Sequence, residues 1–250
     1  MILFSWLLDP ANWTGPYGAL TLIWQHILYT LAAMAAAAVI AVPIGLYVGH
    51  TRRGELLIAG AANILRALPS LGLIVLLVIL LGPVFTSDLA FLVPSLIVLV
   101  LLAVPPIMTG TYSGIANANR AAVDAARGMG FTPLQVLFRV ELPCALPLIF
   151  SGMRGATLQV ISTATIAAYV SLGGLGRLII DGRAQNDYSQ MAAGAILVGL
   201  LALCVDLAIE LMAYLTVSRG LTRRETSRFP NIRRRSDPSS SPTVQRDVSP

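Results

Sequence analysis

The chain is dominated by apolar runs long enough to cross a lipid bilayer, and this feature constrains its fold more than any other. A helix needs roughly 20 apolar residues to span the hydrocarbon core. Runs of about that length lie near residues 27–48, 56–81, 91–112, 145–170 and 188–217. Because a backbone in lipid must satisfy its own hydrogen bonds, these apolar runs predict an all-α membrane protein. The stretch 55–102 can be divided in more than one way, so we expect about five spans, five or six. Pro69 is expected to bend the second run, and Pro94, Pro105 and Pro106 are expected to interrupt the third.

Composition excludes both a soluble globular domain and several classes of enzyme. Hydrophobic residues make up 56% of the chain, charged residues 12%, and the mean hydropathy is +0.77. All seventeen basic residues are arginine, whereas a Walker-type phosphate loop and a Schiff-base enzyme both need lysine. Cys144 and Cys204 lie beside or inside apolar runs, as small buried hydrophobes do. We expect no catalytic residue, no cofactor and no metal.

The distribution of arginine predicts the orientation in the membrane, because cytoplasmic segments carry an excess of basic residues. Five spans with the amino terminus outside would leave only Arg177 and Arg183 on the outer side. The cytoplasmic side would then hold Arg52, Arg53, Arg120, Arg127, Arg139 and every arginine from Arg219 onward. The carboxyl terminus is therefore expected in the cytoplasm.

The chain divides into three expected parts. Residues 1–20 have no positive charge before their apolar residues and carry Trp6 and Trp13, which indicates a retained interfacial segment outside the cytoplasm. Residues 21–217 hold the spans. Residues 218–250 are rich in Arg, Ser and Pro and predict a disordered basic tail in the cytoplasm. Such a tail suits contact with anionic lipid, or alternatively a regulatory contact; nucleic-acid binding is not expected.

A polar segment at 124–143, DAARGMGFTPLQVLFRVELP, predicts two short helices joined by a hinge. Asn119 is a good N-cap for a helix over 120–127, and Gly128 and Gly130 favour its end. Thr132 and Pro133 favour a second start, for a helix through Arg139 that stops before Pro143.

The same segment resembles the signature of binding-protein-dependent ABC transporter permeases, which has a Glu-Ala-Ala triplet, a glycine and an Ile-x-Leu-Pro ending. Those positions are held by Asp124, Ala125, Ala126, Gly130, Val140, Leu142 and Pro143. Asp replaces Glu and Val replaces Ile, and both changes keep charge or shape. NILRALPSLGL, GGLGRLIIDG and GAILVGLLAL further resemble the branch that imports glycine betaine, carnitine and choline.

The resemblance implies the type I ABC importer permease fold for residues 21–217, with 124–143 as a cytoplasmic coupling-helix loop. It also implies a plasma-membrane location in a prokaryote. The partners it implies are a separate ATPase subunit, a second permease chain, the same or related, and an extracytoplasmic solute-binding protein. The binding protein would deliver solute to the outer face near the 173–187 loop. No aromatic cage for a solute cation is evident in the sequence, so we expect recognition to belong to the binding protein.

Four charged residues lie inside apolar runs, where isolated ions are unfavourable: Arg66, Arg154, Asp206 and Glu210. Helical rise places all of them at a similar depth. Arg66 or Arg154 is expected to pair with Asp206 or Glu210 as a packing and gating element. Independent snorkelling of the arginines towards the inner surface is the alternative.

A polar patch along 145–170 has two interpretations. Gln159, Ser162, Thr163 and Tyr169 can line the translocation path, or they can make hydrogen bonds between helices. His26 and His50 lie near opposite ends of 27–48, and each is expected to be interfacial or structural.

The leading interpretation is an importer permease for osmoprotectants. An importer permease for another small solute, such as methionine or another amino acid, is the close alternative. An ion-coupled secondary transporter using Asp206 and Glu210 is a different class, although such carriers usually show internal repeats that this sequence lacks. A membrane anchoring protein without transport is the third class.

Overall fold

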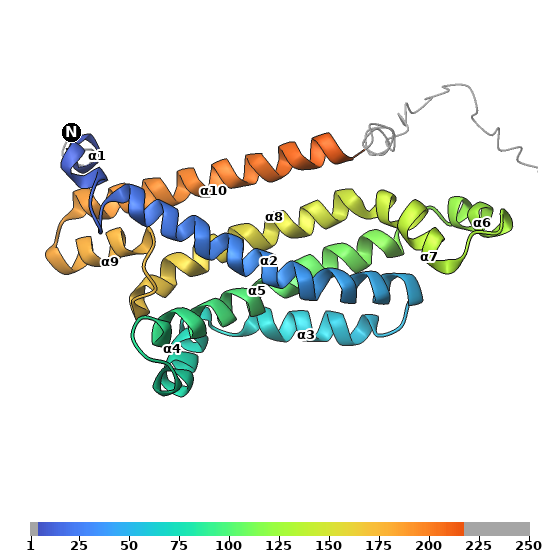
Figure 1. Ribbon diagram of the computed structural model, residues 1–250, viewed down its shortest axis with the longest axis horizontal. Helices are drawn as coiled ribbons and strands as arrows, with labels where there is room; N and C mark the ends of the chain where they lie inside the picture. The colour runs from blue at the N-terminus through green and yellow to red at the C-terminus, as the bar shows by residue number, and fades with distance from the viewer. Residues whose placement is uncertain (1–4, 218–250) are drawn as a thin grey trace, which may run out of the picture. The chain divides into compact units, whose positions relative to one another are not determined.

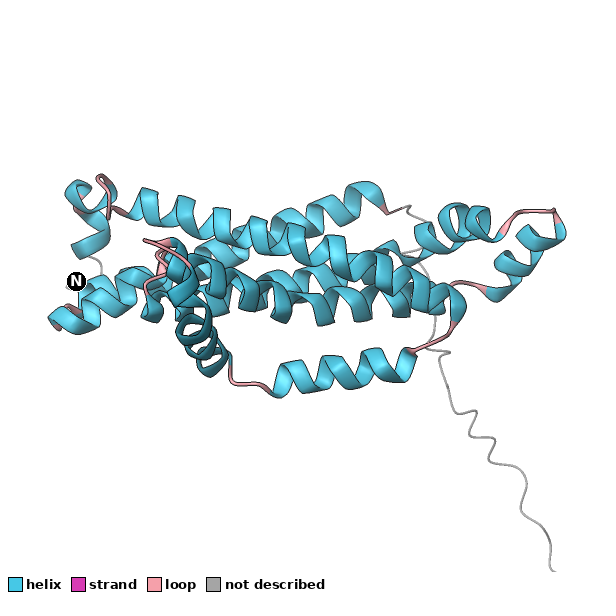
Figure 2. Ribbon diagram, turned by 60° about the horizontal axis from the view of Figure 1, so that its bottom comes forward, coloured by secondary structure: helices cyan, strands magenta, loops and turns pink. Residues whose placement is uncertain are grey.

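The computed structural model describes residues 5–217, apart from the side chains of Leu57 and Arg66. The expected disordered tail at 218–250 lies outside the described residues. Within 5–217 the secondary structure is helical and contains no strand (Figure 2). This agrees with the all-α prediction.

Among residues 5–217, four long helices are apolar enough to cross a membrane (Figure 1). They are α2 (Ala19–Thr51), α5 (Leu89–Ala116), α8 (Leu142–Ala167) and α10 (Tyr188–Thr216). Each corresponds to one of the runs predicted from sequence; α2 and α5 extend beyond their runs at both ends, whereas α8 ends at Ala167 and α10 at Thr216, slightly before the predicted ends. The multi-pass membrane architecture follows from these four helices.

The remaining apolar run, expected as one span bent at Pro69, is a broken pair. α3 (Glu55–Ala67) and α4 (Ser70–Leu81) meet at an angle of 87°. Proline lacks the N–H of a helical residue and disfavours the helical conformation of the residue before it, and Leu68 is extended with φ −72° and ψ 132°. The described residues therefore hold four spans, or five if the pair counts as one.

α5 lies at the centre of the bundle and packs against both α2 and α8 (Figure 1). Glycines allow both contacts: a Cβ on Gly45 would lie 2.6 Å from Thr111 Cβ, and one on Gly152 would lie 2.6 Å from the Pro106 carbonyl oxygen. Close approach of small residues is how helices associate where lipid provides no hydrophobic drive. Pro94, Pro105 and Pro106, expected to interrupt this run, stay inside α5.

The segment expected as a glycine-rich loop before the last span is largely a helix, α9 (Gly176–Gln185). Of its glycines, only Gly173 and Gly174 have the left-handed φ that favours glycine, at +86° and +74°. Gly182 instead allows close packing, since a Cβ there would lie 3.0 Å from Met191. Counting glycines predicted the turn correctly but extended it too far, because glycine also serves helix contact.

α1 (Ser5–Leu8) and the short helix η2 (Pro10–Trp13) lie at the same end of the bundle as α9 (Figure 1). The Trp6 amide donates to the Ser189 hydroxyl at 3.1 Å, and Trp13 Nε1 donates to the Leu7 carbonyl at 2.9 Å. Both tryptophans pack against a buried cluster that includes Leu175. This end of the bundle is called the α9 end below.

Candidate functional site

The segment 120–141 forms the opposite end of the bundle, called the α6 end below (Figure 1). α6 (Arg120–Gly128) begins with the predicted cap, because Asn119 Oδ1 accepts from the Ala121 amide at 3.0 Å. Gly130 then takes a left-handed φ of +85°. A side chain there would contact nothing within 4 Å, so only the backbone conformation demands glycine.

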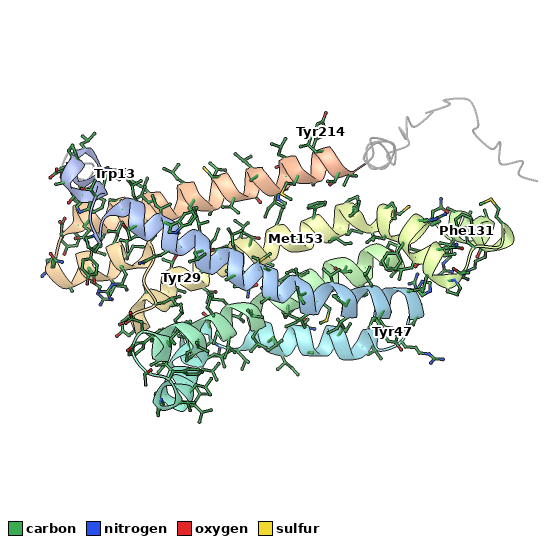
Figure 3. The ribbon with its side chains drawn as sticks, in the orientation of Figure 1. Trp13, Tyr29, Tyr47, Phe131, Met153 and Tyr214 are labelled. Atoms are coloured by element: carbon green, nitrogen blue, oxygen red, sulfur yellow. The ribbon has the colours of Figure 1, made fainter. Side chains whose placement is uncertain are left out.

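α7 (Pro133–Val136) begins in a full capping box. The Thr132 hydroxyl accepts from the Gln135 amide at 3.4 Å, and Gln135 Oε1 accepts from the Thr132 amide at 2.9 Å. Phe131 lies in the turn between α6 and α7 (Figure 3). The predicted hinge between two short helices is present.

The predicted stop before Pro143 is wrong. α7 continues through a π-helical turn, η4 (Leu137–Glu141), directly into α8. The π-helical turn directly precedes Pro143, the second residue of α8, and its wider hydrogen-bond spacing accommodates a residue that has no N–H to donate. Residues 133–170 thus form one helical rod, and a force applied to α7 acts on α8 without an intervening loop.

The signature residues divide between an exposed and a buried side. Asp124, Ala125 and Pro143 are exposed, whereas Ala126 is buried and Val140 packs beside it in a small apolar cluster with Val123 and Val136. Leu142 is partly buried in a second cluster beneath it. Large apolar side chains nearby remain exposed, namely Met129, Leu134 and Phe138. The α6 end therefore exposes a partly apolar surface, and the two packed clusters beneath this surface form its base.

A short side-chain contact links this base to α2, and sequence reasoning missed it. His50 Nδ1 lies 2.6 Å from Glu141 Oε2, and the Glu141 side chain is 8% exposed. Arg52 donates to the Ala116 carbonyl next to it. These residues also line a cavity of about 290 Å³ together with Arg120, Asp124 and Arg127. The two members of the pair are 91 positions apart, so no local pattern reveals it.

Arg154, Asp206 and Glu210 meet in the structure. Arg154 Nε and Nη2 donate to the two Asp206 carboxylate oxygens at 2.7 and 2.6 Å, and Nη2 lies 3.5 Å from Glu210 Oε2. The bidentate arrangement joins α8 to α10. Arg66, the other expected partner, has a side chain outside the described part of the structure.

The four residues expected to line a path do not share one environment. Ser162 and Tyr169 are exposed on one face of the rod 133–170, Gln159 is partly buried, and Thr163 is buried. The exposed face continues towards the α6 end as a groove of about 300 Å³ between α5 and α8. Small and polar residues line it, including Thr109, Gly110, Ser113, Ser151, Gly152 and Gly155.

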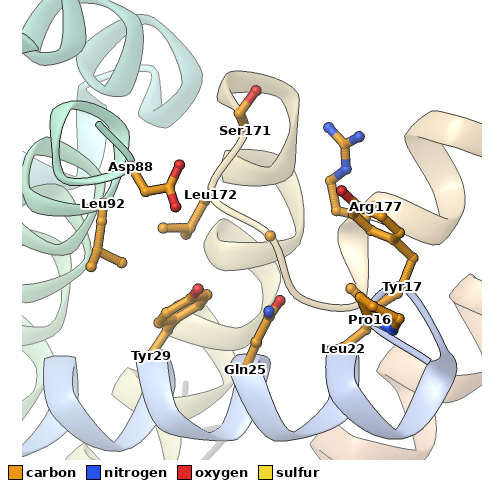
Figure 4. Close-up of a pocket in the computed structure, with 11 residues that line it drawn as sticks. Pro16, Tyr17, Leu22, Gln25, Tyr29, Asp88, Leu92, Ser171, Leu172 and Arg177 are labelled. Carbon is orange, nitrogen blue, oxygen red and sulfur yellow. The ribbon is translucent and has the colours of Figure 1, made fainter. Parts of the chain in front are cut away.

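A second cavity, of about 370 Å³, opens at the α9 end (Figure 4). α2 contributes Gln25 and Tyr29 to it, the start of α5 contributes Asp88 and Leu92, and Arg177 comes from α9. Its lining residues are far apart in the sequence, which is why no motif identified it.

The turn that closes this cavity is held on α2 by side-chain acceptors. Gln25 Oε1 accepts from the Gly174 amide at 3.1 Å, and His26 Nδ1 accepts from the Leu175 amide at 3.3 Å. His26 Nε2 lies 3.3 Å from the Ile161 carbonyl oxygen in α8. His26 thus links α2, α8 and the turn, in agreement with a structural role.

Known proteins resemble this chain in sequence and in fold. Residues 41–216 match the family described as binding-protein-dependent transport system inner membrane component. The choline transport system permease protein OpuBB of Bacillus subtilis (strain 168) is 32% identical over 200 residues, 80% of this chain and 89% of that protein. The carnitine transport permease protein OpuCD of Listeria monocytogenes serotype 1/2a (strain 10403S) is 33% identical over 204 residues, 81% of this chain and 88% of that protein.

Among solved structures, an inward-facing conformation of the MetNI methionine ABC transporter matches with a TM-score of 0.68 at 20% identity, over 78% of this chain and 94% of that one. This likeness concerns the fold, and it confirms the expected importer permease architecture. The family match over residues 41–216 covers most of the chain and identifies its family. The chain belongs to the family of binding-protein-dependent transport system inner membrane components, the permeases of ABC importers.

Proposed function

We propose that the chain is the permease subunit of an ATP-driven importer that carries osmoprotectants such as glycine betaine, carnitine or choline across the plasma membrane of a prokaryote. The observation that carries this proposal is the identity of 30–33%, over about four fifths of the chain, to permeases named for choline, carnitine and glycine betaine. The fold supports transport but does not favour one solute.

ATP is hydrolysed by a separate subunit that docks on the α6 end. Exposed Asp124 and Ala125 with apolar Met129 and Leu134 suit a partner surface, and the packed cluster beneath them keeps the two helices in place. Because α7 runs on into α8, closure of an ATPase dimer would tilt a spanning helix directly. This arrangement favours Asp124 and Ala125 as the coupling contact, with buried Ala126 beneath them and Gly130 setting the turn between the two helices.

The orientation that fits this role places the α6 end in the cytoplasm and the α9 end outside. Arg52, Arg120 and Arg127 line the cavity at the α6 end, in keeping with the excess of basic residues on cytoplasmic segments. The carboxyl terminus is then cytoplasmic, because α10 ends on the same side of the membrane as α6.

A second permease chain, identical or related, covers the groove between α5 and α8. The Ser113 and Ser151 hydroxyls in its lining are unfavourable against lipid tails, whereas a partner chain and water would solvate them. Ser162 and Tyr169 extend the same face towards the outer side. The path for solute runs along this face, between the two chains.

Uptake measurements test the proposal. A bacterial strain without its own osmoprotectant carriers would express the full chain with the ATPase and binding protein encoded beside it, and accumulation of labelled choline, glycine betaine and carnitine would be followed. We expect uptake that needs an intact ATPase active site and survives collapse of the proton gradient. Uptake that continues with an inactive ATPase, or that stops with the proton gradient, would identify an ion-coupled carrier instead.

A further inference from the structure

The cavity at the α9 end has the chemistry of a site for a small cation (Figure 4). Tyr29 of α2 provides an aromatic ring, and Tyr17 provides a second at the rim. Asp88 lies on the wall opposite Arg177. Among the described residues, the Asp88 carboxylate has neither an ion pair nor a side-chain hydrogen bond.

An unpaired carboxylate on the same side of the cavity as the Tyr29 ring favours a quaternary ammonium group. Such a group cannot donate hydrogen bonds, so proteins bind it through the faces of aromatic rings and through opposite charge. Asp88 supplies the charge, Tyr29 the ring, and Leu92 an apolar wall for the methyl groups. A volume of about 370 Å³ lies within the usual range for a small-molecule pocket.

The far side of the cavity suits a carboxylate. Arg177 Nη2 lies 3.0 Å from Asp181 Oδ1, one turn along α9, which leaves other guanidinium donors free for a second acceptor. The guanidinium and the Asp88 carboxylate lie on different sides of the space (Figure 4). A zwitterion with an ammonium group at one end and a carboxylate at the other matches this arrangement.

Two serines near the cavity have left-handed backbone conformations. Ser171, in the lining, has φ 68°, and Ser87, next to Asp88, has φ 59°. Serine adopts the left-handed region rarely, and strain of this kind tends to persist where it positions functional groups. Gln25 additionally holds the Gly173 and Gly174 turn against α2.

We propose that this cavity is a solute site of the permease itself, which binds the quaternary ammonium group between Tyr29 and Asp88 and the carboxylate, where there is one, at Arg177. The proposal rests on the proposed function for its ligand class and for its outward orientation. The site receives solute on the outer side before it enters the path beside α8. It adds a recognition step in the membrane to that of the binding protein.

Ligand binding to the purified full-length chain in lipid nanodiscs tests the site without any need for transport. The probes are choline, glycine betaine and the neutral choline isostere 3,3-dimethylbutan-1-ol, observed by saturation transfer from the protein to the ligand methyl protons. We expect transfer to choline and glycine betaine and at least about tenfold weaker binding of the neutral isostere. Equal signals from all three would overturn the proposal.

Variants locate the two ends of the site. Tyr29→Leu and Asp88→Asn should each weaken choline binding about tenfold, whereas Tyr29→Phe, which keeps the ring, should change it by less than about twofold. Arg177→Gln should weaken glycine betaine but not choline, since choline has no carboxylate. Tyr47→Leu, at the other end of α2, is the matched control and should change neither.

The outcomes separate this inference from the proposed function. If the wild type accumulates these solutes but Tyr29→Leu and Asp88→Asn change neither binding nor the concentration dependence of uptake, the site is wrong and the function stands. If the wild type binds choline with the expected variant pattern but shows no ATP-driven uptake, the site stands and the function is wrong. Thermal unfolding of each variant confirms that it is folded.

Discussion

The guanidinium of Arg154 in α8 makes two parallel hydrogen bonds to the Asp206 carboxylate in α10, at 2.7 and 2.6 Å, and Glu210 lies 3.5 Å from the same group. Two carboxylates thus share one arginine within the apolar length of the spans. The bidentate pair fixes the rotation of α10 relative to α8, and Glu210 compensates the charge from further along α10. The rod that begins at α7 is therefore tied to a second spanning helix near its middle.

Asp206→Asn should lower both thermal stability and uptake, because it removes the negative charge and one of the two acceptors that face Arg154 and leaves Glu210 as its remaining carboxylate partner. Glu210→Gln should have a smaller effect, since the bidentate pair remains. Arg154→Asp should abolish uptake, and combining it with Asp206→Arg should recover a measurable part of it. Thermal unfolding and solute uptake are the measurements. Equal effects of Asp206→Asn and Glu210→Gln, or no recovery in the exchanged pair, would contradict a specific pair.

Gly130→Val should uncouple ATP hydrolysis from uptake while the protein still inserts into the membrane. The left-handed conformation at Gly130 costs a β-branched residue roughly 1–2 kcal/mol, although its side chain would meet no neighbour. Gly130→Asn is the matched control, because asparagine tolerates that conformation. ATPase activity stimulated by the binding protein is measured beside uptake. If the valine and asparagine variants behave alike, the backbone conformation of this turn does not couple ATP hydrolysis to uptake.

Sequence reasoning predicted those features that depend on local pattern. Apolar length indicated the spanning helices, and the caps at Asn119 and Thr132 formed as expected, because each depends on residues within three positions. The sequence predicted the position of the bend at Pro69 but not its size. A proline predicts where a helix bends, whereas the 87° angle depends on the packing of α3 and α4 against other helices.

What the sequence could not indicate depends on contacts between distant residues. The π-turn at 137–141 lets the rod pass Pro143, and a rule that ends helices before proline misses it. His50 and Glu141 pair across 91 positions, and Tyr29 and Asp88 meet only when α2 packs beside α5. No periodicity in the sequence predicts contacts of this kind, so the cavity at the α9 end and the pair at the α6 end are visible only in the folded structure.

Gly152→Ala should destabilise the bundle, whereas Gly155→Ala should not. A Cβ on Gly152 would lie 2.6 Å from the Pro106 carbonyl oxygen, so α5 and α8 must separate, at a cost of about 1–3 kcal/mol. A Cβ on Gly155 meets nothing within 4 Å. Both changes bring the same gain in helix propensity, so the difference between their thermal midpoints measures the clash. Similar midpoints would mean that α5 and α8 lie further apart than in the structure.

His50→Leu should destabilise the protein and reduce uptake, because it leaves the buried Glu141 carboxylate without its partner at 2.6 Å. An unsatisfied buried polar group costs about 1–3 kcal/mol, and more when it is charged. Changing Glu141 to Leu in the same protein removes the orphaned charge, so the double variant should be more stable than His50→Leu alone. Uptake, however, should stay low in both, because the pair connects α2 to the rod that carries α7. Thermal unfolding and uptake of the single and double variants form a complete cycle. Additive losses of stability would show that the two residues act independently, and full uptake in the double variant would show that the link between α2 and α8 serves stability alone.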